Sequence, residues 1–483
     1  MKTFQRSLQQ ATTQFTDGVH PTRIQESEAV LSVTLVYSKQ QTEEWVIVNR
    51  IGFAGTAKAM QTEGRQDQFK LLPRGGVAAQ MSCCSGSSQK TVPKTEDCLA
   101  FCMLPLPVQT GLPVHVNGHF ALDQEARRGL WDNEGDARTK WNKAIVLQVV
   151  VPAYITAIKH VKNVWFPANR PADIMALQRY HALFPDLQNA PSKRPWALLM
   201  KELYKQVAEM PLFPVVQNDK TIITWASVVK TDGFPGYFCN TTDFFKSIVD
   251  VSRRGQNVVL SGGVQTASHQ SGSEKVVKEM ELRFIKLLKD LNMHVIHTPY
   301  SVMKNFLDSG VDKVQEVCPA TLITFLKSAS SPQEDGCRIG SLPTPVSETP
   351  FKDAPNIQLF LKFARLDKEF SDKLEGLPLC LRQSGQLTFF EKIEDTLKRP
   401  VASKFLHLLS GSPDMFLHER VYGYFLPVPE KIGEMVQEMN IDMLARMLPA
   451  TVSVSVYRTG KPCPFFARQS SLPRVAEEHM DIF

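Results

Sequence analysis

The stretch Cys102–Leu122, CMLPLPVQTGLPVHVNGHFAL, decides how this chain folds. Three of its residues are prolines, which fix the backbone φ angle and remove an amide donor, so the stretch cannot be an α-helix. The pattern predicts an extended segment, a turn at Gln109–Gly111, and then a strand that Asn117–Gly118 closes. We therefore expect a β-sheet around this stretch.

The residues immediately after it are expected to begin a helix over 123–131. Asp123 can cap the first turn, and Glu125 lies where a carboxylate interacts favourably with the helix dipole. The same segment carries the adjacent cations Arg127 and Arg128.

Apolar alternation and β-branched residues predict more strands on the N-terminal side. Residues 29–36 and 45–51 are expected to form a hairpin, 75–79 another strand, and 99–122 two more. The composition of residues 82–95 predicts a loop. The expected result is a mixed sheet of about five strands.

After this sheet the apolar pattern becomes helical. Residues 139–160 predict one amphipathic helix with a bend at Pro152. Further helices are expected at residues 171–184, 194–209, 241–252, 274–291, 300–309, 356–373 and around 401–409.

Two segments share a plan of strand, polar turn and strand, namely Met210–Trp225 and Leu377–Phe390. Each precedes a stretch that is rich in helix formers. Two interpretations stay open, because any β-hairpin has this pattern, and so does a stacked repeat of hairpin-helix units.

The fold class predicted from these patterns is α+β, with a mixed-sheet domain followed by helix-rich, repeat-like segments with β-hairpins. The expected parts are a polar N-terminal tail at 1–26, a mixed-sheet domain at 27–138, a helix-rich region at 139–327 with a hairpin at 210–225, a Pro/Ser-rich linker at 328–355, and a second hairpin-helix module at 356–483.

Composition narrows the classes of partner and the cellular location. The chain has 483 residues and a formal charge of +6, which is not gathered into the basic stripe that a nucleic-acid partner requires. The apolar run 144–158 is interrupted by Gln148 and Pro152 and is shorter than the ~20 residues of a membrane span. No secretory signal opens the sequence, and the nine cysteines are irregularly spaced, so a cytoplasmic protein with free thiols is expected.

No complete catalytic or metal-binding pattern is found. His115 and His119 are four residues apart, but the segment is extended and not helical, so we expect structural roles for both. A site at His294 and His297 has no neighbouring carboxylate pair, and the cysteines at positions 83, 84, 98 and 102 fit no standard zinc spacing. Since no glycine loop that could hold a phosphate is present either, we expect no cofactor and no enzymatic activity.

The sequence of residues 71–160 nevertheless resembles that of the sacsin family. The resemblance rests on Leu72–Ala79, Phe101–Leu122, Glu125–Trp131 and Trp141–Asn142. It continues in Glu375–Leu379 with Gly385 and in Asp414–Glu419, so it covers most of residues 28–425.

The resemblance implies a part of a repeat that follows a nucleotide domain like that of heat-shock protein 90. The helix bearing Glu and Asn, the Asp-x-Gly-x-Gly loop and the glycine-rich lid of that domain are all absent here. The sheet is therefore expected to be similar to a chaperone middle domain, in which an arginine reaches toward the γ-phosphate. Arg127 and Arg128 are the candidates for phosphate sensing in a longer relative, with a surface salt bridge as the alternative.

The resemblance thus implies a chaperone or co-chaperone fragment in protein quality control, without an ATP site of its own. Its expected partners are client proteins and the seventy-kilodalton heat-shock chaperone, and not nucleic acid or membrane. The alternative is a subunit or fragment of a heat-shock-protein-90-like ATPase whose nucleotide pocket lies outside this chain.

Overall fold

A computed structural model of the chain divides it into two compact units. Unit 1 contains Met1–Cys239 and Val295–Glu316, and unit 2 contains Asn240–His294 and Val317–Phe483. The structure describes residues 2, 5, 6, 8, 9, 26–38, 41–53, 71–85, 88–90, 98–123, 129–167, 174–189, 195–215, 224–229, 236–238, 270–296, 298–312, 314–329, 342–391, 397–398, 413–422, 424 and 436–437.

Unit 1 is built on a seven-stranded mixed sheet in which β1, β2, β3, β7, β5 and β6 follow one another and β4 pairs with β3. All neighbours are antiparallel except β7 and β5, which run parallel. The strands are β1 (Ser27–Ser38), β2 (Gln41–Ile51), β3 (Arg74–Ser85), β4 (Ser88–Lys90), β5 (Leu99–Cys102), β6 (Leu104–Gln109) and β7 (His115–Gly118).

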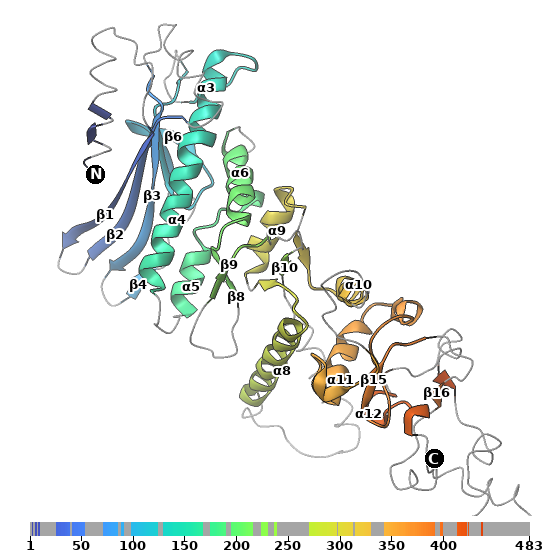
Figure 1. Ribbon diagram of the computed structural model, residues 1–483. Helices are drawn as coiled ribbons and strands as arrows, with labels where there is room; N and C mark the ends of the chain where they lie inside the picture. Colours follow the sequence, from blue (N-terminus) through green and yellow to red (C-terminus); the bar gives the residue numbers. More distant parts are fainter. Residues whose placement is uncertain are drawn as a thin grey trace, which may run out of the picture. The chain divides into compact units, whose positions relative to one another are not determined.

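One face of this sheet is covered by the helix that follows it. α3 (Ala137–Ile145), a π-helical turn (Val146–Val150) and α4 (Val151–Trp165) form a continuous helical run that packs on β2, β3 and β7 (Figure 1). The π turn comes just before Pro152, whose missing N–H cannot continue the usual ladder. The predicted helix over 139–160 is therefore confirmed.

By length and composition, the helical run Ala137–Trp165 could also cross a membrane. It spans 29 residues, whereas the apolar run seen in the sequence covers only residues 144–158. However, 67% of its most apolar window is buried inside the fold, because its apolar side chains meet the sheet on one side and α6 (Trp196–Ala208) on another. In unit 1 it is a core helix.

Two neighbouring side chains of α3 hold the Cys102–Leu122 stretch against this helix. The indole Nε1 of Trp141 donates to the carbonyl of His119 at 2.9 Å. The buried amide of Asn142 accepts from the Ala121 N–H at 2.8 Å and donates to the carbonyls of Ala121, at 2.9 Å, and Trp131, at 3.1 Å. These bonds satisfy backbone groups that would otherwise be unpaired inside the protein.

The predicted helix over 123–131 is wrong in its described part. Leu122 and Leu130 form an antiparallel bridge, and the Asp123 N–H donates to the Gly129 carbonyl at 3.0 Å. Residues 124–128, which include Arg127 and Arg128, lie outside the described residues. The bridge forms in place of the expected helix because the Asn142 side chain hydrogen-bonds to the backbone of Ala121 before the bridge and of Trp131 after it.

The sheet has more strands than predicted. The hairpin of β1 and β2 is confirmed, but β3 continues to Ser85 and pairs with β4 where a loop over 82–95 was expected. The range 99–122 contains three strands instead of two. The additional one arises because Met103, at φ 65°, reverses the chain between β5 and β6 within a single residue.

The rest of unit 1 continues the same core. α6 packs on α4 and α9, and the predicted hairpin at 210–225 is confirmed as antiparallel β8 and β9. A small parallel sheet joins β10 to β11 and β12. The elements are α5 (Ile174–His181), α6 (Trp196–Ala208), β8 (Phe213–Val215), β9 (Thr224–Ala226), β10 (Gly236–Phe238), β11 (Val295–Ile296), α9 (Tyr300–Asp308) and β12 (Val314–Glu316).

Unit 2 has a core of its own, in which Phe284 of α8 meets Phe363 of α11 with ring centroids 4.9 Å apart. The predicted hairpin at 377–390 is confirmed as antiparallel β14 and β15, and Thr344 pairs with Leu387. The elements are α8 (Gln270–Asp290), α10 (Pro319–Ala329), β13 (Thr344–Pro345), α11 (Ala354–Ala364), β14 (Cys380–Leu381), β15 (Gln386–Thr388), β16 (Leu397–Lys398), α12 (Glu419–Tyr422) and β17 (Val436–Gln437).

Two segments of unit 2 differ from expectation. The helix expected over 356–373 ends at Ala364, and a separate 3₁₀ turn follows at Phe370–Lys373. Residues 342–355, from the stretch expected to be a linker, provide β13 and the fully buried Phe351. The helices expected at 241–252 and around 401–409 lie outside the described residues.

Candidate functional site

The face of the unit 1 sheet opposite α4, called the outer face, carries half-buried apolar and amide side chains. Val46 and Val48 point to α4 and are fully buried, so the residues between them point the other way. Strand register then places side chains in two rows across neighbouring strands. One row is Ile47, Ala78 and His115, and the other is Asn49, Gly76, Asn117 and Phe101.

His115 lies at the centre of an aromatic cluster on this face. Its ring stacks on Trp45 with centroids 5.4 Å apart and meets the edge of Phe101 at 5.5 Å. Its Nδ1 accepts a hydrogen bond from the Leu99 N–H at 3.0 Å, so Nε2 carries the proton in the neutral ring. The predicted structural role fits this arrangement, in which the ring links β7 to β5.

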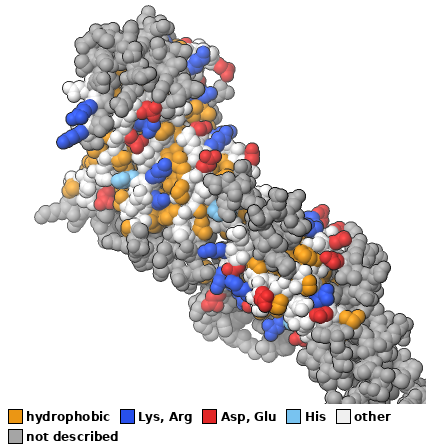
Figure 2. All heavy atoms as spheres, in the orientation of Figure 1, with side chains coloured by type: hydrophobic (Ala, Val, Ile, Leu, Met, Phe, Trp, Pro, Cys, Tyr) orange, Lys and Arg blue, Asp and Glu red, His pale blue; other side chains and the backbone are white. Residues whose placement is uncertain are grey.

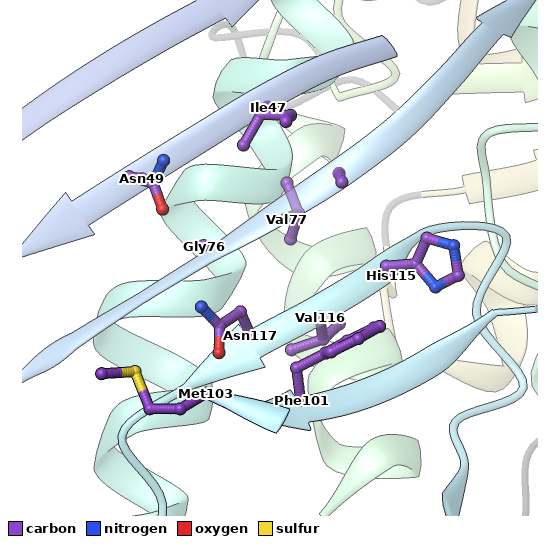
Figure 3. Close-up of a pocket in the computed structure, with 10 residues that line it drawn as sticks. Ile47, Asn49, Gly76, Val77, Phe101, Met103, His115, Val116 and Asn117 are labelled. Carbon is purple, nitrogen blue, oxygen red and sulfur yellow. The ribbon is translucent and has the colours of Figure 1, made fainter. Parts of the chain in front are cut away.

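A pocket of about 240 Å³ opens beside this cluster (Figure 3). Its walls combine apolar side chains with two amides, which lie on either side of Gly76 (Figure 3). A Cβ at Gly76 would come within 2.1 Å of the Val48 carbonyl, so glycine is required there. The lining residues are Ile47, Asn49, Gly76, Val77, Ala78, Phe101, Met103, His115, Val116 and Asn117.

A second pocket of about 230 Å³ adjoins the first and shares Met103 and Asn117 with it. Arg74 is the one formally charged side chain among its described lining residues. The remaining lining residues are Leu8, Leu72, Gly75, Gly118 and His119.

His119 is held in the neutral form in this second pocket. Desolvation by burial, and after it the nearby Arg74 guanidinium, lower the pKa of its ring. The Nδ1 atom accepts from the Leu72 N–H at 2.9 Å, a bond that the protonated ring could not accept. Among the described residues that line the second pocket, Arg74 is therefore the one that carries a charge, and this charge is positive.

Met103 forms a shared wall of both pockets and is unusually exposed. Its relative exposure is 73%, the same as that of its neighbour Leu104, which lines neither pocket. Exposed large apolar side chains beside a hollow are typical of surfaces that bind other molecules. On the face visible in Figure 2, positive and negative side chains of the described residues are interspersed.

The candidate residues from the sequence are not brought together here. Arg127 and Arg128 lie outside the described residues, as does His297. His115 and His119 point to the same face, yet each uses its Nδ1 atom to accept from a different backbone amide. In the described part of the chain no group of three His, Cys, Asp or Glu residues could hold a metal ion.

Cys102 also has a structural environment. Its thiol donates to the Phe120 carbonyl at 3.6 Å, and burial raises the pKa of the thiol. A raised pKa disfavours the reactive thiolate.

Sequence reasoning missed Asn49, Gly76, Phe101 and Met103 as members of one site. The sequence signal that could have found this site is the period-two alternation in β2 and β3. One side of the alternation is the buried core side, and the other side still carries the large apolar residues Trp45 and Ile47.

Comparison with known proteins gives one relative. The chain is 28% identical to human sacsin over 406 residues, which cover 77% of this chain and 8% of sacsin. No protein-family model matches the chain, and no solved structure matches it. The predicted resemblance is confirmed: along most of its length this chain is sacsin-like, similar to a small part of that protein.

Proposed function

We propose that the chain is a chaperone or co-chaperone fragment that binds non-native client proteins. The sequence similarity to sacsin supports a chaperone-related role. The observation that carries the proposal is the outer face, where Met103 is 73% exposed beside two pockets and half-buried aromatic rings. Such a surface can bind the apolar segments that unfolded chains expose.

In this proposal the chain acts in the cytoplasm, without enzymatic activity and without an ATP site of its own. The seventy-kilodalton heat-shock chaperone is a proposed partner to which clients would pass. His115 and His119 each accept a backbone N–H at Nδ1, so neither offers that atom as a catalytic base, which agrees with a binding role for the outer face.

The test is suppression of client aggregation by the full chain in buffer without nucleotide. Light scattering from a thermolabile reporter enzyme is followed with and without a stoichiometric amount of the chain, and with serum albumin as an inert control. We expect slower aggregation with the chain alone. The same rate in all three samples would refute the proposal.

Titration with a fluorescent ATP analogue tests the absence of a nucleotide site. We expect no saturable binding by this chain. Micromolar binding would instead show a nucleotide site within this chain and refute this part of the proposal.

A further inference from the structure

We infer that the two pockets of the outer face are consecutive subsites for one extended polypeptide segment. The first subsite takes an apolar side chain, and the second takes an acidic side chain two residues along the segment. This inference rests on the proposed function, since it names the chemistry of the client segment that the outer face recognises.

Strand register gives the spacing of the subsites. Along β7 and the residue after it, the first pocket is lined by residues 115–117 and the second by residues 117–119, a shift of two positions. On β3 the lining moves from residues 76–78 to 74–75, which is the same direction in space because Gly76 pairs with Asn117 and Gly75 with Gly118. Two residues of a strand span about 6.6 Å, which is also the spacing of same-side neighbours in an extended peptide.

The size of the pockets favours single side chains over a small-molecule ligand. Their volumes of about 240 and 230 Å³ both fall below the roughly 300–1,000 Å³ of typical ligand pockets. Each has room for one large side chain, and an extended peptide occupies both at once.

The chemistry differs between the two subsites. The first combines Ile47, Ala78 and Phe101 with the amide of Asn49, and none of its lining residues is an acid, a lysine or an arginine. An apolar side chain is the match for those walls. The second carries Arg74, and no carboxylate is among the described residues that line either pocket. Arginine pairs with carboxylates in a bidentate manner, so an acidic side chain is the match.

The wall between the subsites suits the peptide backbone between the two side chains. Asn117 belongs to both pockets, and a side-chain amide can both donate and accept hydrogen bonds. Gly76, which has no side chain, lies between Asn49 and Asn117 on this wall (Figure 3).

Fluorescence anisotropy with the full chain tests the spacing and the charge. The probes are labelled peptides with the cores Leu-Thr-Glu, Leu-Thr-Lys, Ser-Thr-Glu and Leu-Glu-Thr in one flexible flanking sequence. We expect Leu-Thr-Glu to bind at least about tenfold more tightly than the other three. Equal affinities, or an equally tight Leu-Glu-Thr peptide, would overturn the inference.

Three variants connect the result to the site. Met103→Asn removes the shared apolar wall with a residue that tolerates a positive φ, and should weaken Leu-Thr-Glu binding about tenfold. Leu104→Asn is the matched control, because Leu104 is equally exposed and lines neither pocket, and should bind as the wild type does. Arg74→Gln should abolish the preference for Glu over Lys while leaving binding of the Leu side chain.

Circular dichroism of each variant establishes that it is folded. If Leu104→Asn weakens binding as much as Met103→Asn, or if Arg74→Gln retains the charge preference, the inference fails. If the wild-type chain suppresses aggregation but binds all four peptides alike, the proposed function stands and the two-subsite inference alone is refuted.

Discussion

Asn142 shows how much of this fold depends on one buried amide. It is 3% exposed and makes three hydrogen bonds, two to the backbone of Ala121 and one to the carbonyl of Trp131. The residue stands beside Trp141 in the sacsin-like part of the sequence, and both side chains hydrogen-bond to backbone groups. The pair that supports the resemblance is therefore structural in this chain.

Replacement of Asn142 by Ala is expected to lower the free energy of unfolding of unit 1 by roughly 2–4 kcal/mol, because buried backbone groups lose their partners. Urea denaturation followed by tryptophan fluorescence measures this change. The control is Lys143→Ala on the exposed side of the same helix, which should have little effect. An Asn142→Ala protein as stable as the control would contradict the structural role.

His119 gives unit 1 a stability that depends on pH. Its pKa in the folded state is lowered from 6.5, so below that pH the unfolded chain binds more protons than the folded chain does. Stability from this group is complete above the unfolded-state pKa and is lost as the pH falls toward the folded-state pKa. Unit 1 should therefore be less stable at about pH 5.5 than at about pH 7.5.

The contribution of His119 is isolated with His119→Gln, whose unfolding free energy should vary less between these two pH values. His418 of unit 2 also has a lowered pKa, chiefly from burial, but it is present in both proteins and cancels in the difference. Identical pH profiles for the two proteins would show that His119 is not held neutral by the fold.

At the scale of the element, β3 is the strand on which the sheet depends. It pairs with β2 along its length, with β7 on its other side, and with β4 at its end. Glycine at position 76 permits this close pairing, whereas the period-two pattern of the sequence shows only that a strand is present. The sequence therefore indicated the strand, but not the reason for its glycine.

Gly76→Ala is expected to destabilise unit 1 by at least about 3 kcal/mol, because the added Cβ lies 2.1 Å from the Val48 carbonyl and β2 would have to move. Gly129→Ala is the matched control, since nothing lies within 4 Å of its Cβ position. Thermal unfolding compares the two. Equal melting temperatures would show that the β2–β3 pairing adapts at no cost.

At the scale of the whole molecule, the net charge of +6 is spread over 483 residues. The visible surface in Figure 2 mixes positive and negative side chains among its described residues. Binding of nucleic acid depends on concentrated cations that release counterions from the phosphates. The charge distribution thus gives no support to such a partner.

We expect the full chain to bind a labelled DNA duplex no more tightly than about 10⁻⁴ M at about 0.15 M salt, the weak end of non-specific binding. Fluorescence anisotropy measures it, with a polylysine-tagged form of the chain as the positive control. Micromolar affinity with a steep dependence on salt would reveal a basic surface that the charge count does not predict.

The sequence by itself determined the α+β class, the first hairpin, the helix after the sheet, both later hairpins and the similarity to sacsin. These follow from periods of two or 3.6 residues and from turn residues, which act between near neighbours. Only the tertiary structure decided that β7 lies between β3 and β5, that residues 122 and 130 bridge where a helix was expected, and that the outer-face pocket collects residues of four strands. Strand order and the Asn142 bonds join residues far apart along the chain, so their free energy is realised only once the whole sheet has packed against its helix.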